Sequence, residues 1–192
     1  TSLNINETLI NGDKIYAVTE DGIFTADVTS NLLIDFNNWQ QQFSSRNFSH
    51  IINFNNNIYI TENSNLFELN NNVLTLVRNF FEPIVNLNSS TLNLTVTLGK
   101  TIIVLDASGN QTVEFNTVLD FDFTATNAFF DNNTMYIGTK EFGILKTTSA
   151  SSNKYQEVHP EGPLENGVFA IEVNNNDLWV VYGGYSAFYG SL

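Results

Sequence analysis

The sequence contains no cysteine, three prolines, and only seven lysine or arginine residues against twenty aspartate or glutamate residues. Without cysteine, the chain forms no disulfide bond and no thiolate metal site. The net charge of −13 argues against nucleic-acid binding, because the few cationic residues are scattered and form no stripe that could displace phosphate counterions. The sequence also lacks an apolar run of about 18 residues, so we expect no membrane span.

The sequence is rich in apolar residues, at 42%, in aromatic residues, at 13%, and in asparagine, which occurs 30 times. The apolar and aromatic fractions are typical of a folded globular chain, and 192 residues suffice for one domain. Asparagine tolerates left-handed backbone and is frequent in turns. We therefore expect a turn-rich, folded chain, either a single domain over residues 1–192 or a fragment of one.

A unit of about 40 residues recurs along the chain. Two apolar runs separated by polar turns are seen in NGDKIYAVTEDGIFTADV from Asn11, in NNNIYITENSNLFELNNN from Asn55 and in DNNTMYIGTKEFGILKTT from Asp131. A period near 40 is typical of solenoids and propellers, and short runs of β-branched and aromatic residues indicate strands. Aligned on one register position, five units are spaced by 43, 35, 42 and 43 residues, at Tyr16, Tyr59, Leu94, Tyr136 and Trp179.

The second unit divides into four predicted strands, at residues 50–54, 58–61, 66–69 and 73–77. Asparagine triplets at 55–57 and 70–72 separate the first strand from the second and the third strand from the fourth. We expect these triplets to form tight hairpin turns that need positive φ. Four antiparallel strands in about 40 residues are typical of one propeller blade.

The predicted fold is therefore an all-β propeller of four-stranded antiparallel blades. Four full blades and a partial fifth blade at 167–192 are expected, which makes about four and a half blades. Two arrangements stay open: an arc of a larger propeller, or a closed five-blade ring in which residues 1–5 supply the missing outer strand.

The repeats resemble a known family of propellers. YAVTEDGIFTAD and YIGTKEFGILKT are similar to the short repeat of two-component-regulator propellers, which has an aromatic residue, a small apolar pair, threonine, and then glycine followed by isoleucine or leucine. The closing stretch PEGPLENGVFAIEVNNNDLWVVYGGYSAFYG resembles the propeller of PorZ-like proteins of type IX secretion systems. The resemblance covers the whole chain at the level of blades and is most specific over the last 30 residues.

PorZ-like proteins work at the bacterial cell surface, in an attachment complex with a sortase and outer-membrane partners, and bind anionic lipopolysaccharide. The resemblance implies an exported, outer-membrane-associated protein at the cell surface. It also implies a non-catalytic binding module, without metal or cofactor, that presents a rigid rim to a protein partner or to a lipopolysaccharide or other glycan. Two alternatives stay open: the sensor propeller of a hybrid two-component regulator and, less favoured, a propeller hydrolase or lyase.

Ligands of propellers usually meet the loops at one rim. The loops between the second and third predicted strands contribute four candidate binding residues, which are Glu20, Lys140, Tyr182 and Tyr185. The two tyrosines flank Gly183-Gly184, and exposed rings beside bare backbone could stack on a sugar, although Tyr182 could instead pack between blades.

Other residues have weaker signals for chemistry. Asp120 and Asp122 are two apart, so on a strand they would share one face and could hold calcium or act as an acid–base pair. An enzyme would need carboxylates from different blades, and Glu7, Glu82 and Asp122 are the candidates. His50 and His159 lack the spacing of a zinc motif, and we expect structural roles for both.

Overall fold

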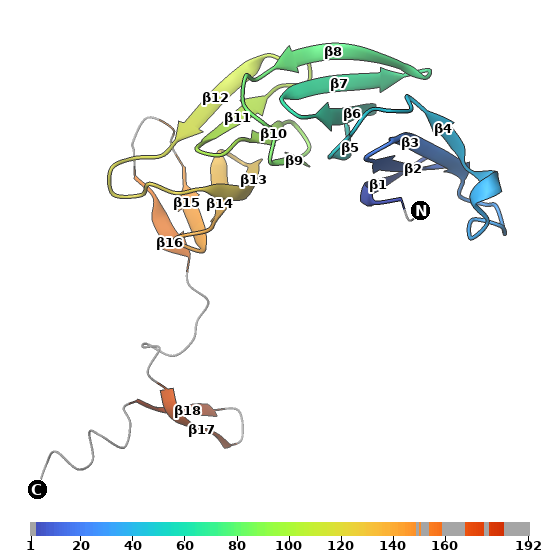
Figure 1. Cartoon of the computed structure of the whole chain (residues 1–192). Helices are drawn as coiled ribbons and strands as arrows, with labels where there is room; N and C mark the ends of the chain where they lie inside the picture. Colours follow the sequence, from blue (N-terminus) through green and yellow to red (C-terminus); the bar gives the residue numbers. More distant parts are fainter. Residues whose placement is uncertain (1–2, 149, 151–153, 159–167, 175–176, 183–192) are drawn as a thin grey trace, which may run out of the picture. The chain divides into compact units, whose positions relative to one another are not determined.

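The computed structural model describes residues 3–148, 150, 154–158, 168–174 and 177–182. The chain divides into two compact units, Thr1–Val158 and His159–Leu192. Strands dominate the described residues, which contain no α-helix and one short 3-10 helix, η1 (Phe36–Asn38) (Figure 1). The all-β fold predicted from the sequence is confirmed.

The first unit consists of four four-stranded sheets, each a simple antiparallel meander. Blade 1 contains β1 (Ile5–Asn11), β2 (Lys14–Thr19), β3 (Gly22–Asp27) and β4 (Gln40–Gln42). Blade 2 contains β5 (Ile51–Phe54), β6 (Asn57–Glu62), β7 (Asn65–Asn70) and β8 (Val73–Asn79). Blade 3 contains β9 (Asn86–Ser89), β10 (Leu94–Thr97), β11 (Thr101–Leu105) and β12 (Gln111–Asn116). Blade 4 contains β13 (Ala125–Asp131), β14 (Thr134–Thr139), β15 (Ile144–Thr147) and β16 (Gln156–Val158).

The asparagine-rich turns adopt the backbone that the sequence predicts. Asn55 and Asn56 join β5 to β6 with φ of 50° and 63°, and Asn71 and Asn72 join β7 to β8 with φ of 48° and 62°. Two consecutive residues with positive φ match the right-handed twist of the flanking strands, and asparagine adopts this conformation at low cost.

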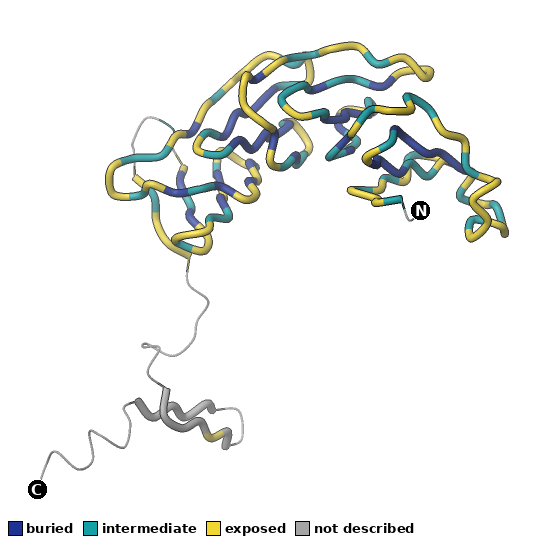
Figure 2. The backbone as a smooth tube through the Cα atoms, in the orientation of Figure 1, coloured by how far each residue is buried: buried dark blue, intermediate teal, exposed yellow. Residues whose placement is uncertain are grey.

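The four blades lie side by side in chain order. Their first strands contact one another in sequence, β1 with β5, β5 with β9, and β9 with β13. Apolar cores fill the spaces between neighbouring blades, and burial is concentrated in the inner and middle strands (Figure 2). Side chains of the two faces of a strand alternate, so the middle strands of blades 2 and 3 present side chains to the cores on both sides. This explains why the middle strands read as continuous apolar runs.

The register of the repeat holds in four of the five units. Tyr16, Tyr59, Tyr136 and Trp179 each occupy the third position of the second strand of their hairpin. In blade 3 the alignment on Leu94 is wrong by one residue.

Thr95 is the equivalent residue, because the hairpin closes from the Ser90 amide to the Asn93 carbonyl, two positions before Thr95. Thr95 faces blade 4, where its hydroxyl accepts a bond from the Phe130 amide. Leu94 belongs instead to the core shared with blade 2.

The second unit contains one described hairpin, β17 (Val168–Asn174) paired with β18 (Asp177–Tyr182). The last residue pair of this hairpin is Asn174 with Asp177, which have the same sequence spacing as Asn11 and Lys14 at the first hairpin of blade 1. The third strand expected near the end of the chain lies outside the described residues. Of the residues expected to supply a closing strand, Ile5 lies in β1 and pairs with Thr19, so it belongs to blade 1.

Candidate functional site

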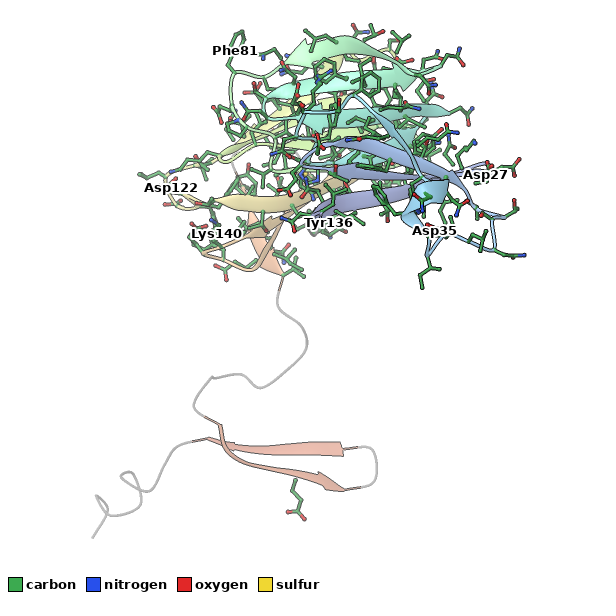
Figure 3. All side chains as sticks on the ribbon, turned by 45° about the vertical axis from the view of Figure 1, so that its right-hand side comes forward. Asp27, Asp35, Phe81, Asp122, Tyr136 and Lys140 are labelled. Carbon is green, nitrogen blue, oxygen red and sulfur yellow. The ribbon has the colours of Figure 1, made fainter. Side chains whose placement is uncertain are left out.

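The meander topology places two kinds of loop at opposite ends of each blade. One end carries the turns between second and third strands and the connections between blades, at residues 43–50, 80–85 and 117–124. We call this end the connector rim. Phe81, Asp122 and Lys140 project from it, whereas Asp27 and Asp35 lie at the other end of the blades (Figure 3).

A polar hollow of about 400 Å3 opens on the connector rim where blades 1 and 2 meet. It is lined by Asn6 of β1, by Glu20 of the β2–β3 turn, and by Asn47, Ser49 and His50 of the connection to blade 2. Two amides, a carboxylate, a hydroxyl and an imidazole thus face one space. This set can donate and accept hydrogen bonds with a polar ligand.

The side chains around the hollow are held by bonds between the two blades. The Asn6 Nδ2 donates to the Phe48 carbonyl at 2.7 Å. Glu7 lies beside the hollow, where its Oε2 accepts from the Ile51 amide at 2.8 Å and lies 3.4 Å from the His50 Nδ1. These contacts join residues more than 40 positions apart, so the hollow exists only when blade 1 packs on blade 2.

The connection that forms one wall of the hollow is fixed through its backbone. The Phe48 amide donates to the Thr19 carbonyl at 3.0 Å, and the Ser49 amide donates to the Thr61 carbonyl at 2.9 Å. The His50 amide donates to the Thr61 hydroxyl at 3.0 Å. A wall held in this way loses little conformational entropy when a ligand binds.

Arg46 anchors the start of the same connection. Its guanidinium forms two hydrogen bonds with the Glu62 carboxylate, at 2.9 and 2.6 Å, which raise the pKa of Arg46. The guanidinium also lies 4.9 Å from the ring centroids of both Phe48 and Phe67. Arg46 therefore couples the connector rim to the core between the blades.

The four candidate binding residues lie in different places. Glu20 lines the polar hollow. Lys140 lies on the connector rim two blades further along, so the structure does not bring it into the same site. Tyr182 ends β18, but its side chain lies outside the described part, as does the whole of Tyr185. The sugar-stacking role of these tyrosines stays a prediction.

Asp120 and Asp122 do not share the face of a strand. Asp120 lies in a turn and Asp122 in the following loop, because the chain closes a local bridge between Val118 and Phe121 instead of extending as a strand. The Asp122 carboxylate forms an ion pair with Lys100. Nearby, the Glu141 carboxylate accepts a 2.6 Å bond from the Thr124 amide, which lowers its pKa.

The candidate catalytic carboxylates come from separate elements. Glu7 lies in β1, Glu82 is exposed in the connection between blades 2 and 3, and Asp122 lies in the next connection. Among the described residues, no group of three or more histidine, aspartate or glutamate side chains is placed to hold a metal ion. His50 lines the hollow, and His159 lies outside the described part. No helix within that described part has the length and apolar character needed to cross a membrane.

Sequence reasoning missed Asn6, Asn47 and Ser49 as members of the hollow. All three are common polar residues without a motif, and none lies in the predicted turn between second and third strands. For Asn47 and Ser49 the only available signal was position, since both precede the predicted strand at residues 50–54. No strand was predicted around Asn6, which lies in β1.

No family model and no curated protein matches the sequence. Solved structures with similar folds do match. PorZ, a surface component of the type IX secretion system of Porphyromonas gingivalis, aligns with 15% identity and a TM-score of 0.61 over 94% of this chain and 25% of its own. The fold is a β-propeller.

Two further propellers support this assignment. The extracellular domain of the one-component system BT4673 from B. thetaiotaomicron aligns with 13% identity and a TM-score of 0.63, over 93% of this chain and 26% of its own. YCF48 bound to D1 peptide aligns with 14% identity and a TM-score of 0.58, over 93% of this chain and 60% of its own. The chain thus spans about a quarter of the length of PorZ and of the BT4673 extracellular domain.

Proposed function

We propose that this chain is a non-catalytic binding module of a PorZ-like protein of a type IX secretion system, exported and associated with the outer membrane at the cell surface. In this proposal the connector rim binds a protein partner through the polar hollow between blades 1 and 2. The observation that carries it is the hollow itself, in which hydrogen-bonding side chains are held on a wall that is bonded to both blades. Such a preorganised surface suits binding.

A protein partner suits the charge better than lipopolysaccharide does. The chain carries a net charge of −13, and an anionic polysaccharide would be repelled by it. At the hollow itself, Glu20 and the neighbouring Glu7 add negative charge. Backbone amides, lysine and arginine of a protein partner would donate hydrogen bonds to the Glu20 carboxylate and to the amide and hydroxyl oxygens of the hollow.

The proposal of a non-catalytic role rests on the hydrogen-bond and ion-pair partners of the candidate catalytic carboxylates. Glu7 accepts a backbone bond and contacts His50, and Asp122 pairs with Lys100, so both carboxylates have structural partners. Turnover of a polysaccharide that is lost in a Glu7→Gln variant would favour the hydrolase or lyase alternative instead.

A sensor propeller is the second candidate, favoured by the likeness to the BT4673 extracellular domain. Both candidates place the module outside the cell and use it for binding. They differ in the partner, which would be a small ligand for a sensor and a protein of a surface complex for a PorZ-like module.

Site-specific photocrosslinking tests the proposal. A benzophenone amino acid is placed at Asn47 in the hollow and, as a matched control, at Asn132, an exposed asparagine in a turn at the other end of blade 4. Each protein is expressed in the native cells, irradiated and analysed by mass spectrometry.

We expect one surface protein to crosslink at position 47 but not at position 132, and the adduct to weaken in a Glu20→Gln variant. Equal crosslinking at both positions, or retention by lipopolysaccharide without any protein adduct, contradicts a protein-binding rim.

A further inference from the structure

One aromatic side chain projects from the middle of the connector rim. Phe81 is 93% exposed and lies in the connection between blades 2 and 3 (Figure 3). Phe80 and Ile84 of the same connection are 7% and 6% exposed and belong to the core between these two blades. Blades 1 and 4 pack on the other sides of blades 2 and 3. The connection is therefore anchored at both sides of Phe81, between blades that each have two neighbours.

The backbone at Phe81 is unfavourable for a bulky residue. Its φ is 61°, in the left-handed region, whereas seven of the ten non-glycine residues with positive φ in the described part are asparagine. Phe43 also has positive φ, but its ring packs 6.3 Å from that of Phe48 in the core between blades 1 and 2. Neither backbone preference nor core packing accounts for phenylalanine at position 81. Exposed residues in strained conformations cluster at functional sites.

Hydrogen bonds hold this strained conformation in place. The Phe81 amide donates to the Asn79 Oδ1 at 3.0 Å, and the Asn79 Nδ2 donates in turn to the Ser64 Oγ at 3.2 Å. The Ile84 amide donates to the Asn63 carbonyl at 2.8 Å. The ring is therefore presented on a fixed backbone, which lowers the entropy lost when a partner binds.

The turn that holds Phe81 also holds a wall of the polar hollow. Asn63 and Ser64, which bond to the connection around Phe81, belong to the β6–β7 turn. Glu62 ends β6 at the same turn and forms the two hydrogen bonds with Arg46, at the start of the connection that lines the hollow. The polar hollow and Phe81 are thus anchored to one turn of blade 2, so a single partner can contact both.

The charge beside Phe81 is negative. Glu82 is the one charged residue in the sequence of residues 80–85, and it is exposed. Arg78 donates to the Gln111 Oε1 at 2.7 Å, and its guanidinium lies 5.3 Å from the ring centroid of Phe80. With a net charge of −13, the chain repels a second copy of itself and attracts a cationic surface.

We propose that Phe81 is the anchor with which the connector rim docks into an apolar pocket of a protein partner, and that this pocket is edged by lysine or arginine facing Glu82. The inference rests on the proposed binding of a protein at this rim and specifies the chemistry of the partner. Aromatic side chains that fill a pocket of the partner are typical hot spots of protein interfaces.

Crosslinking in the native cells locates the contact. The benzophenone amino acid is placed at Glu82 and, in a separate protein, at Asn47 in the hollow. We expect the same surface protein to crosslink at both positions, and its crosslinked segment at position 82 to carry apolar residues beside lysine or arginine. That protein is then purified and titrated with the chain and its variants by isothermal titration calorimetry.

Matched variants test the ring itself. Phe81→Asn supplies a residue that adopts the observed φ at low cost, so it should fold at least as stably in urea yet bind roughly thirtyfold more weakly. Leu92→Asn also removes an exposed apolar side chain, at a 73% exposed residue in the β9–β10 hairpin at the other end of the blades, and should bind as the wild type does. Glu82→Gln should weaken binding by roughly twofold to threefold and reduce its salt dependence.

Unchanged binding by Phe81→Asn, or an equal loss in Leu92→Asn, would overturn the inference. An adduct at position 82 with a second copy, with another segment of the same chain or with lipid would also overturn it, as would a loss of stability in Phe81→Asn that matches its loss of binding. An adduct at position 47 without one at position 82 contradicts the anchor but leaves the proposed function. An adduct at position 82 alone supports the anchor and contradicts the role of the hollow, and no protein adduct at either position contradicts both.

Discussion

Replacing Arg46 by alanine removes one side chain that serves two structural roles. The two hydrogen bonds with Glu62 are charge-assisted and partly shielded, since the two side chains are 31% and 27% exposed, and we assign them about 1–1.5 kcal/mol. The contacts with the rings of Phe48 and Phe67, each at 4.9 Å, add about 0.5 kcal/mol each. Arg46→Ala should therefore lower the free energy of unfolding by about 2–2.5 kcal/mol.

Urea denaturation followed by circular dichroism measures this loss. With a slope of about 2 kcal/mol per molar urea, the midpoint should fall by about 1 M. The matched control is Lys100→Ala, which breaks the ion pair with Asp122, where both side chains are more than half exposed. Such exposed pairs contribute about 0.5 kcal/mol or less, so this midpoint should hardly move.

A double-mutant cycle isolates the ion pair. Arg46→Ala and Glu62→Ala together should cost less than the sum of the single variants, with a coupling free energy of about 1 kcal/mol. Equal losses in Arg46→Ala and Lys100→Ala, or a coupling near zero, would refute the view that Arg46 joins the rim to the core.

Gly22→Ala should lower the free energy of unfolding by about 2 kcal/mol or more, because φ is 98° and an added Cβ would lie 2.4 Å from the Gln42 carbonyl oxygen. Gly99→Ala should be tolerated, because no atom lies within 4 Å of its added Cβ. Thermal melts of the two variants test this difference. Burial raises the pKa of Tyr155 to about 12, so its contribution to stability should be full below pH 10 and lost as the pH rises toward 12. Urea midpoints of the wild type should then fall more steeply over this range than those of Tyr155→Phe, and parallel curves would contradict this. Asn56→Val should cost about 1 kcal/mol at a φ of 63°, and Asn56→Gly should be near neutral, as thermal melts would show.

Local pattern was sufficient to predict the strands of the blades. The second blade was predicted at residues 50–54, 58–61, 66–69 and 73–77, and the observed strands differ by no more than two residues at their ends. Strand formation here depends on short apolar runs and on asparagine turns, both of which are visible within a few residues. The same reasoning misplaced Leu94, because the register position of blade 3 holds threonine, Thr95, and the alignment took the apolar residue before it.

Side chains at the candidate site were harder to predict. Glu20 was predicted because a turn at the rim is a common place for ligand contacts, and the structure places it in the lining of the polar hollow. Asp122 would share a face with Asp120 on an extended strand, but a local bridge turns the chain there. Asn6 and Asn47 carry no motif, and their role depends on which residue of the next blade each one meets.

The sequence by itself determined the repeat, the strand order within each blade and the turns, because these follow from hydrophobic periodicity and from the backbone preferences of single residues. Only the tertiary structure decided which polar residues share a hollow. Bonds such as that from the Ile51 amide to Glu7 join residues 44 positions apart. Whether two such residues meet in space depends on how one twisted sheet packs on the next, and no short stretch of sequence specifies that packing.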